Sequence, residues 1–270
     1  EKYFLRWSER AKWRIDEEGN NRGYGAYWRG LADHARGGAE RGLTEQWTCV
    51  GPYMQPTVQG LGVVSMVAVH PQNDSIVCVA TEDAGCWRTT DQGAHWQLIP
   101  AVHDPDLVVF DPVDGDHVYA ISLDKLFRSD DAGLNWTELP VPDSIAQRMS
   151  QIVVDPGNHL RVDLYGYQMM ARSADQGSTW TWLSDRTVRS VVVKPDDPSV
   201  RYGLNGVVLY RSSDGGLSYD SLTSIWSDFS PTQLAVSPAA PDRVYALLPS
   251  TSQTGLGKVA IAEDQGQTFT

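Results

Sequence analysis

The stretch Thr89-Thr90-Asp91-Gln92-Gly93-Ala94-His95-Trp96 decides the fold, because the chain returns to its pattern four more times. Each copy has an aspartate, a glycine two residues later and an aromatic residue three residues after that glycine. Successive aspartates are separated by 40, 44, 39 and 50 residues, spacings that are typical of repeat architectures. The repeated positions are Thr89, Asp91, Gly93 and Trp96; Ser129, Asp131, Gly133 and Trp136; Ser173, Asp175, Gly177 and Trp180; Ser212, Asp214, Gly216 and Tyr219; and Asp264, Gly266 and Phe269.

These residue types together predict a tight turn. Short Asp, Ser and Thr side chains hydrogen-bond nearby backbone amides, and Gly adopts backbone conformations that other residues resist. The aromatic residue that follows then begins a strand and packs inward. We therefore expect the five aspartates to be structural, although they resemble catalytic or calcium-binding carboxylates.

The residues around the first copy read as four short strands, at 65–69, 75–80, 85–89 and 95–99, separated by turn residues. The order returns in register in the later copies, where the second strand recurs as Val118-Tyr119-Ala120 and Val244-Tyr245-Ala246. Four antiparallel strands of this length per repeat form one blade of a β-propeller. The sequence therefore predicts an all-β propeller with five visible blades over residues 47–270.

The motif Ser/Thr-x-Asp-x-Gly-x-x-aromatic resembles the Asp box, so the chain resembles the Asp-box (BNR-type) β-propellers of the sortilin-like and xyloglucanase-like superfamily. That group includes sialidases, sortilin-type receptors, xyloglucan-degrading hydrolases and photosystem assembly factors. The resemblance implies that each Asp box joins the two outer strands of a blade, away from the ligand site. It also implies six or seven blades in the complete protein, with this sequence as its front part. A complete five-bladed propeller is the alternative.

Residues 1–46 differ from the rest and predict a short helical leader packed on the propeller. Apolar residues recur at helical spacing over residues 3–11 and again over 24–36. The leader Arg6-Trp7-Ser8-Glu9, followed by Trp47-Thr48-Cys49-Val50-Gly51-Pro52, resembles secreted propeller proteins of bacteria with type IX secretion. That resemblance implies an extracellular or outer cell-surface location.

The charge balance argues against nucleic acid as a partner. The chain carries a formal net charge of −12, and the acidic excess lies entirely after residue 48. Phosphate neutralisation by basic residues supplies most nucleic-acid affinity, and an acidic surface is also repelled by anionic lipids. No apolar run approaches the ~18 residues that a membrane-spanning helix needs. The partners we expect are another surface or secreted protein, or a polysaccharide, within a longer chain or larger assembly.

No cofactor or metal is expected. The six His are scattered without the spacing of metal ligands, and no Gly-x-Ser-x-Gly nucleophile motif occurs. Cys78 and Cys86 lie on strands that should be neighbours, which permits a disulfide; two buried free thiols are the other possibility. Both alternatives stay open at this point.

Four arginines first suggest a sialidase, which binds a substrate carboxylate with three converging arginines. Arg88, Arg128, Arg172 and Arg211 each stand directly before the first residue of a repeated turn. They therefore occupy one repeat position on the third strand and do not converge. This pattern argues against a sialidase.

Propellers generally bind ligands where the loops between strands two and three, and between strands four and one, gather around the central channel. Carboxylates and aromatic residues in these loops could bind a sugar, with the rings stacking on sugar faces. The candidate binding residues are Glu82, Asp83, Asp124, Lys125, Tyr165, Tyr167, Asn205, Trp226 and Asp228.

The sequence favours a non-catalytic binding or scaffold module for a protein or polysaccharide partner. The alternative is a glycoside hydrolase with paired carboxylates. Asp83 is the catalytic candidate, because it is placed like the first-blade aspartate of the xyloglucan hydrolases that the chain resembles. The resemblance implies that the second carboxylate would come from another propeller.

Overall fold

The computed structural model describes residues 63–82, 84–146, 149–167, 169–184, 188–224, 233–249 and 256–269. All of these belong to one compact unit, Val50–Thr270. The leader expected over residues 1–46 lies outside the described residues.

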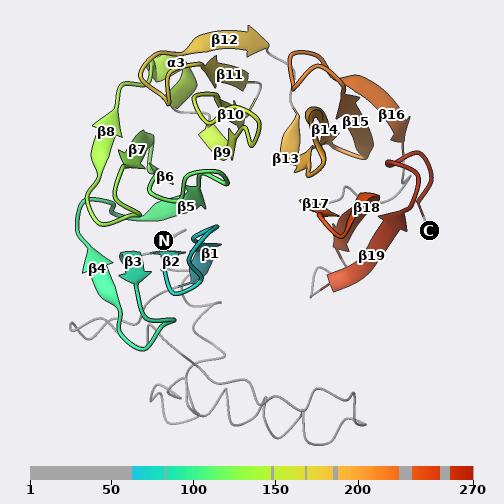
Figure 1. The fold of residues 1–270 in the computed structure, drawn as a ribbon. Coiled ribbons are helices and arrows are strands. Elements are labelled where there is room, and N and C mark those ends of the chain that lie inside the picture. The colour runs from blue at the N-terminus through green and yellow to red at the C-terminus, as the bar shows by residue number, and fades with distance from the viewer. Residues whose placement is uncertain are drawn as a thin grey trace, which may run out of the picture. The chain divides into compact units, whose positions relative to one another are not determined.

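The described chain forms five antiparallel sheets in sequence order (Figure 1). Four sheets have four strands each, and three strands of the fifth are described. Blade 1 contains β1 (Val64–Val69), β2 (Val77–Thr81), β3 (Gly85–Thr89) and β4 (Gln97–Ile99). Blade 2 contains β5 (Pro105–Phe110), β6 (Val118–Ser122), β7 (Lys125–Ser129) and β8 (Thr137–Leu139).

The remaining blades repeat this plan. Blade 3 contains β9 (Met149–Val154), β10 (Val162–Gly166), β11 (Met169–Ser173) and β12 (Thr181–Ser184). Blade 4 contains β13 (Arg189–Lys194), β14 (Asp197–Asn205), β15 (Val208–Ser212) and β16 (Asp220–Ser224). Blade 5 contains β17 (Gln233–Ser237), β18 (Ala240–Pro249) and β19 (Leu256–Ala262).

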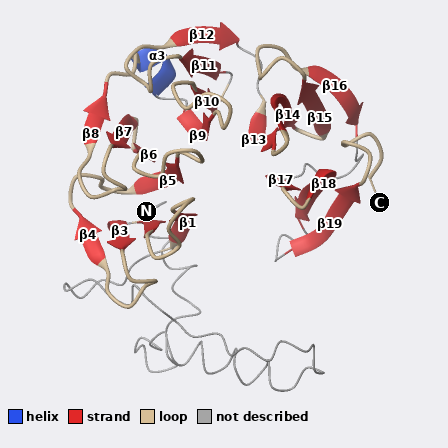
Figure 2. Ribbon diagram, viewed as in Figure 1, coloured by secondary structure: helices blue, strands red, loops and turns tan. Residues whose placement is uncertain are grey.

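The first strands of consecutive blades contact one another, from β1 through β5, β9 and β13 to β17. This is the β-propeller that the repeat predicted, and Figure 2 shows that its regular secondary structure is almost entirely strand. One short helix was not predicted from the sequence: α3 (Asp143–Ala146), which precedes β9 and buries Ile145.

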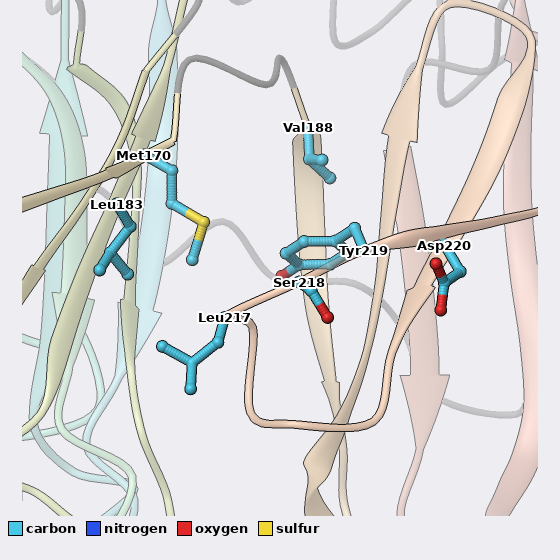
Figure 3. A pocket seen from close by; sticks show the side chains of 7 residues that line it. All are labelled: Met170, Leu183, Val188, Leu217, Ser218, Tyr219 and Asp220. Atoms are coloured by element: carbon cyan, nitrogen blue, oxygen red, sulfur yellow. The ribbon is translucent and has the colours of Figure 1, made fainter.

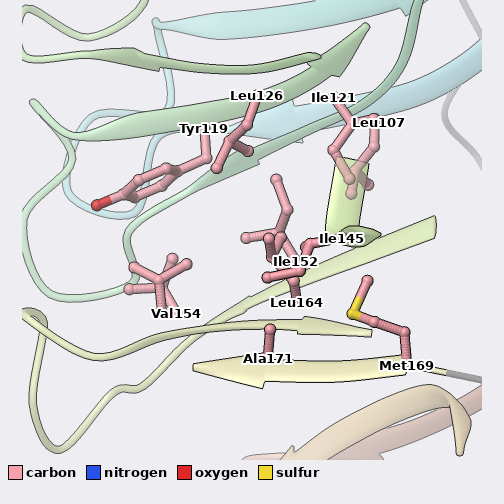
Figure 4. Packing of buried hydrophobic residues seen from close by; sticks show 11 residues of the cluster. Leu107, Tyr119, Ile121, Leu126, Ile145, Ile152, Val154, Leu164, Met169 and Ala171 are labelled. Atoms are coloured by element: carbon pink, nitrogen blue, oxygen red, sulfur yellow. The ribbon is translucent and has the colours of Figure 1, made fainter. Parts of the chain in front are cut away.

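The core lies between the blades, because alternate residues of a strand point to opposite faces of its sheet. On β5, Val108 and Phe110 pack in the cluster shared with blade 1, whereas Leu107 and Val109 pack in the cluster shared with blade 3. Figure 4 shows the second of these clusters, where side chains of blades 2 and 3 interdigitate around Ile145 of α3. Further clusters join blades 3 and 4 and blades 4 and 5.

The repeated motif forms a turn between the third and fourth strands, called the repeat turn below. In blade 1, Thr89 Oγ1 donates to Asp91 Oδ1 at 2.8 Å, and the Gly93 amide donates to Thr89 Oγ1 at 3.0 Å. The His95 amide donates to the same Asp91 oxygen at 2.8 Å. Gly93 has a φ of +88°, in the region that Gly tolerates best. The aspartate thus accepts bonds that close the turn.

The repeat-turn aspartates predict a loss of stability in acid. Hydrogen bonds lower the pKa of Asp175 from 3.8 to about 2, first from the Thr179 hydroxyl, then from the Ser173 hydroxyl and the Thr179 amide. A depressed pKa stabilises the fold above the unfolded value, and this stability is lost as pH falls from about 4 toward 2. We expect the urea midpoint to drop across this window. Asp175→Asn should flatten the drop when the two midpoint curves are compared.

The four arginines of the third strand join neighbouring blades. Each lies one residue before a repeat turn and donates to the residue after the aspartate in the next blade's repeat turn. We call this contact the interblade clasp. Its pairs are Arg88 Nε to Ala132 O at 2.7 Å, Arg128 Nη1 to Gln176 O at 3.2 Å, Arg172 Nη2 to Gly215 O at 2.6 Å, and Arg211 Nη2 to Gln265 Oε1 at 3.3 Å.

The two cysteines of blade 1 are free and buried, so of the two alternatives the structure has the thiols. Burial raises the pKa of the Cys78 thiol to about 12, which leaves it protonated and unreactive at neutral pH. Cys78 packs at the boundary with blade 2, where its Sγ lies 2.8 Å from the place of a Cβ on Gly133.

Candidate functional site

Four carboxylates gather at one end of blades 1 and 2. Glu82 follows β2, Asp104 precedes β5, Asp106 lies on β5, and Asp124 lies in the β6–β7 turn. Because neighbouring strands are antiparallel, all four lie at the end of the blades opposite the repeat turns, called the loop end here. Their side chains belong to exposed residues. These four residues are called the loop-end acids below.

The charges of the loop-end acids act on one another. Partial burial raises the pKa of Asp106, and the negative charges of Glu82, Asp104 and Asp124 raise it further. Like charges affect a pKa in this way only at short range, within about one screening length of ~10 Å. Asp104 has a φ of +46°, a conformation that few non-Gly residues adopt. The structure thus brings together Glu82 and Asp124 of the sequence candidates and adds Asp104 and Asp106.

No described lysine or arginine forms an ion pair with Asp104, Asp106 or Asp124. The nearest in sequence, Lys125, pairs instead with Glu138 of β8 at 2.7 Å. The described residues contain no group of three or more His, Cys, Asp or Glu side chains that could hold a metal ion. Asp104, Asp106 and Asp124 therefore offer hydrogen-bond acceptors and negative charge to a ligand.

The other sequence candidates separate into three groups. Tyr167 is 60% exposed, with the Arg189 guanidinium 5.5 Å from its ring centroid, and Asn205 is exposed at the end of β14. Lys125 is exposed but paired, as described above. The candidates that lie outside the described residues are Asp83, Trp226 and Asp228.

The expectation that Tyr165 lies on the binding face is wrong. Tyr165 is 1% exposed, because β10 continues to Gly166 and turns this side chain toward blade 4. Its hydroxyl lies 3.0 Å from the Tyr219 hydroxyl and accepts a bond from Arg201 Nη1 at 3.2 Å. Tyr165 is therefore part of the contact between blades 3 and 4 and cannot stack on a ligand.

That contact contains a buried ion network that sequence reasoning did not find. Arg201 of β14 is fully buried, and its Nη2 lies 2.5 Å from Asp155 Oδ2. Its Nη1 also pairs with Asp163 of β10, which binds Arg172 Nε at 2.6 Å. Arg161 pairs with Asp155 from the other side. The network joins two blades through the buried residues Arg201, Asp155 and Asp163, so we assign it to stability.

A small cavity of about 230 Å³ lies between blades 3 and 4 (Figure 3). Figure 3 shows Met170 and Leu183 facing Leu217, with the Tyr219 ring and Asp220 beyond. The remaining lining residues are Val188 and Ser218. The lining is of mixed polarity, because the apolar side chains lie beside Ser218, the Tyr219 ring and the Asp220 carboxylate.

Among the described residues, no helix has the length and apolar character needed to cross a membrane.

Comparison with known proteins points to propellers of two kinds. No family model matches the chain. A curated xyloglucanase of a Paenibacillus species is 24% identical over 199 residues, which cover 71% of this chain and 18% of the relative. The chain therefore spans less than a fifth of that relative's length.

Solved structures of low identity share the fold. The GH74 xyloglucanase of Xanthomonas campestris superposes with a TM-score of 0.64 at 17% identity, over 77% of this chain and 38% of that one. YCF48 bound to the D1 peptide superposes with a TM-score of 0.57 at 15% identity, over 81% of this chain and 69% of that one. At these identities the likeness establishes a β-propeller of the architecture that xyloglucanases and YCF48 share.

Proposed function

We propose that this chain is a non-catalytic binding module that holds a polysaccharide against the loop-end acids. The observation that carries the proposal is the gathering of Glu82, Asp104, Asp106 and Asp124, which keeps the pKa of Asp106 raised at an exposed surface. Carboxylates accept hydrogen bonds from sugar hydroxyls. Repulsion between neighbouring carboxylates is unfavourable for the fold, and groups with pKa values shifted in this way cluster at functional sites.

The relatives support a polysaccharide as the first ligand to test. One curated relative and one of the solved structures are named as xyloglucanases. Tyr167 offers an exposed aromatic ring at the loop end of blade 3, suited to stacking on a sugar. A protein partner is the other candidate, because YCF48 was solved with a bound peptide.

Binding can be measured by isothermal titration of the 270-residue chain with xyloglucan oligosaccharides. We expect the double variant Asp106→Asn, Asp124→Asn to bind at least about tenfold more weakly, a loss of ~1.4 kcal/mol for two hydrogen-bonding charges. Asp116→Asn is the matched control, since Asp116 is an exposed aspartate of blade 2 at the opposite end. Equal losses in both variants would point to net charge, and no change in either would reject the site.

Hydrolysis is the second candidate function, and the raised pKa of Asp106 favours it. A carboxyl whose pKa is raised by burial and by neighbouring carboxylates has the character of a general acid, with Glu82 or Asp124 as the partner base. Release of reducing ends from xyloglucan tests this. Activity lost in Asp106→Asn and kept in Asp116→Asn would replace the binding module by a glycoside hydrolase.

The same residue predicts an effect on stability. A raised carboxyl pKa means that ionised Asp106 is disfavoured in the fold, so its contribution to stability falls as pH rises above about 4. Asp106→Asn should therefore raise the urea midpoint at pH 7 and leave it nearly unchanged at pH 3. An equal or lower midpoint at pH 7 would show that the loop-end acids are not strained by repulsion.

We further propose that the chain is an Asp-box propeller that acts outside the cell or on its outer surface, as the leader suggests. It would then serve as one module of a longer chain or larger assembly. Localisation of the tagged chain in a bacterium with type IX secretion tests this, and retention inside the cell would contradict it.

A further inference from the structure

Blade 1 differs from the other blades at one face. Each inner strand is followed by a turn that contains a proline, and the residue four positions before that proline is apolar in all blades. These equivalent residues, which belong to the row that faces the preceding blade, are Val67, Val108, Ile152, Val191 and Leu234. The last four are 1–7% exposed, whereas Val67 is 56% exposed.

The neighbours of Val67 on β1 share its exposure. Val64 is 49% exposed and Val69 is 52% exposed, although Phe110 and Val154, which occupy the place of Val69 in blades 2 and 3, are 7% and 4% exposed. We call Val64, Val67 and Val69 the β1 face. Val79 and Trp87, farther out on the same sheet, are buried, so the open area lies along the inner strand. A row of apolar residues along a strand is seldom left open to solvent, and such a row marks a surface that another element covers.

The clasp identifies what fits the β1 face. Gln92 is the residue after the aspartate in the repeat turn of blade 1. The equivalent residues of blades 2 to 5 accept a hydrogen bond from the arginine of the preceding blade, and the φ of Gln92, +59°, matches those of Ala132 and Gln176. No described side chain donates to the Gln92 carbonyl. Blade 1 therefore has a hydrogen-bond acceptor, the Gln92 carbonyl, and an apolar row, the β1 face. The equivalent residues of the other blades contact the preceding blade.

Blade 5 lacks the complementary donor. The residue before its repeat-turn motif is Ile261, at the position of Arg88, Arg128, Arg172 and Arg211. Closure of the ring by blade 5, or head-to-tail pairing with the blade 5 of a second copy, would leave the Gln92 carbonyl without its clasp.

We propose that the β1 face binds a further propeller blade that carries an arginine directly before its own repeat turn. The inner strand of that blade covers Val64, Val67 and Val69, and its arginine donates to the Gln92 carbonyl. The interface is the same in kind as the four that the structure contains, and it is independent of the ligand at the loop end.

The test inserts a copy of residues 188–232, which include blade 4 with Arg211, between residues 62 and 63 of the full chain. All variants carry Cys49→Ser, and Val67→Cys serves as the probe for reaction with a thiol reagent, because Cys78 and Cys86 are buried. Leu123→Cys is the control, since Leu123 is 65% exposed and far from this face in the blade plan. A second insertion carries Leu in place of the copied Arg211.

We expect the thiol of Val67→Cys to react rapidly in the parent chain and at least about tenfold more slowly with the arginine-bearing copy, because labelling then requires the interface to open. The thiol of Leu123→Cys should react equally fast in both. The copy without arginine should protect the thiol at position 67 less. Equal protection by the two copies would show that the arginine does not contribute to the interface. No protection by either copy, or loss of the fold on insertion, would overturn the proposal.

Three measurements on the chain without an inserted blade exclude the competing occupants. Slow reaction of the Val67→Cys thiol there would mean that the chain's own residues cover the face. A disulfide between Val67→Cys and Ala235→Cys would mean that blade 5 closes the ring, and a dimer by light scattering that Val67→Lys disperses would mean self-association. Each of these results contradicts the proposal, which predicts a monomer with no such disulfide.

Discussion

Replacing Arg201 by alanine is expected to lower the free energy of unfolding by about 3 to 5 kcal/mol, the cost of breaking a buried ion pair from one side. Arg201 is 0% exposed and holds two carboxylates, Asp155 and Asp163, that are 2% and 0% exposed. Without the guanidinium both charges stay buried, and Arg161 and Arg172 at the rim compensate only in part. Urea unfolding followed by Trp fluorescence measures the loss.

Arg243→Ala is the matched control for this prediction. Arg243 pairs with Glu263 at 2.8 Å, but the two side chains are 38% and 68% exposed. Exposed pairs contribute about 0 to 1 kcal/mol, so this variant should unfold almost as the parent does. Similar losses in both variants would mean that the network between blades 3 and 4 is solvated and does not lock them.

Gly177→Ala is expected to cost about 2 to 5 kcal/mol, from backbone strain of about 1 to 2 and overpacking of about 1 to 3. Gly177 closes the repeat turn of blade 3 at a φ of +90°. A Cβ there would lie 2.6 Å from Leu139 Cδ1 of blade 2, so the new methyl group pushes neighbouring blades apart. The thermal unfolding midpoint reports the effect.

Gly206→Ala separates the two causes. Gly206 has a positive φ of +58°, but no atom lies within 4 Å of the place of its Cβ. We expect only the strain, about 1 to 2 kcal/mol. If both variants lose the same free energy of unfolding, the close approach of the preceding blade is not the reason that the repeat turn requires Gly.

The architecture could be predicted because its cause is local and repeated. Each repeat turn is closed by hydrogen bonds between residues a few positions apart, such as those of Asp175 with Ser173 and Thr179. An eight-residue pattern is therefore enough to predict the geometry of the turn. The order of strands around it follows from short apolar runs that are separated by turn residues. The short helix α3 was missed because only four residues form it, too few to show a helical repeat of apolar residues.

The site could be predicted only in part, because its members are brought together by packing between blades. Glu82 and Asp124 were found as loop acids, whereas Asp106 lies on an inner strand that pattern reading treats as buried. Tyr165 failed for the opposite reason, since one further strand residue turned it inward. The partners of Arg201 lie 38 and 46 residues away in sequence, and no local pattern predicts such a contact.

The most direct test of the binding module is hydrogen exchange of the 270-residue chain with and without saturating xyloglucan oligosaccharide. We expect slower exchange in the peptides that contain Glu82 and Asp124 and unchanged exchange in the repeat turns around Asp91 and Asp131. Protection confined to the repeat turns, or none anywhere at a concentration that saturates binding, would contradict a ligand site at the loop-end acids.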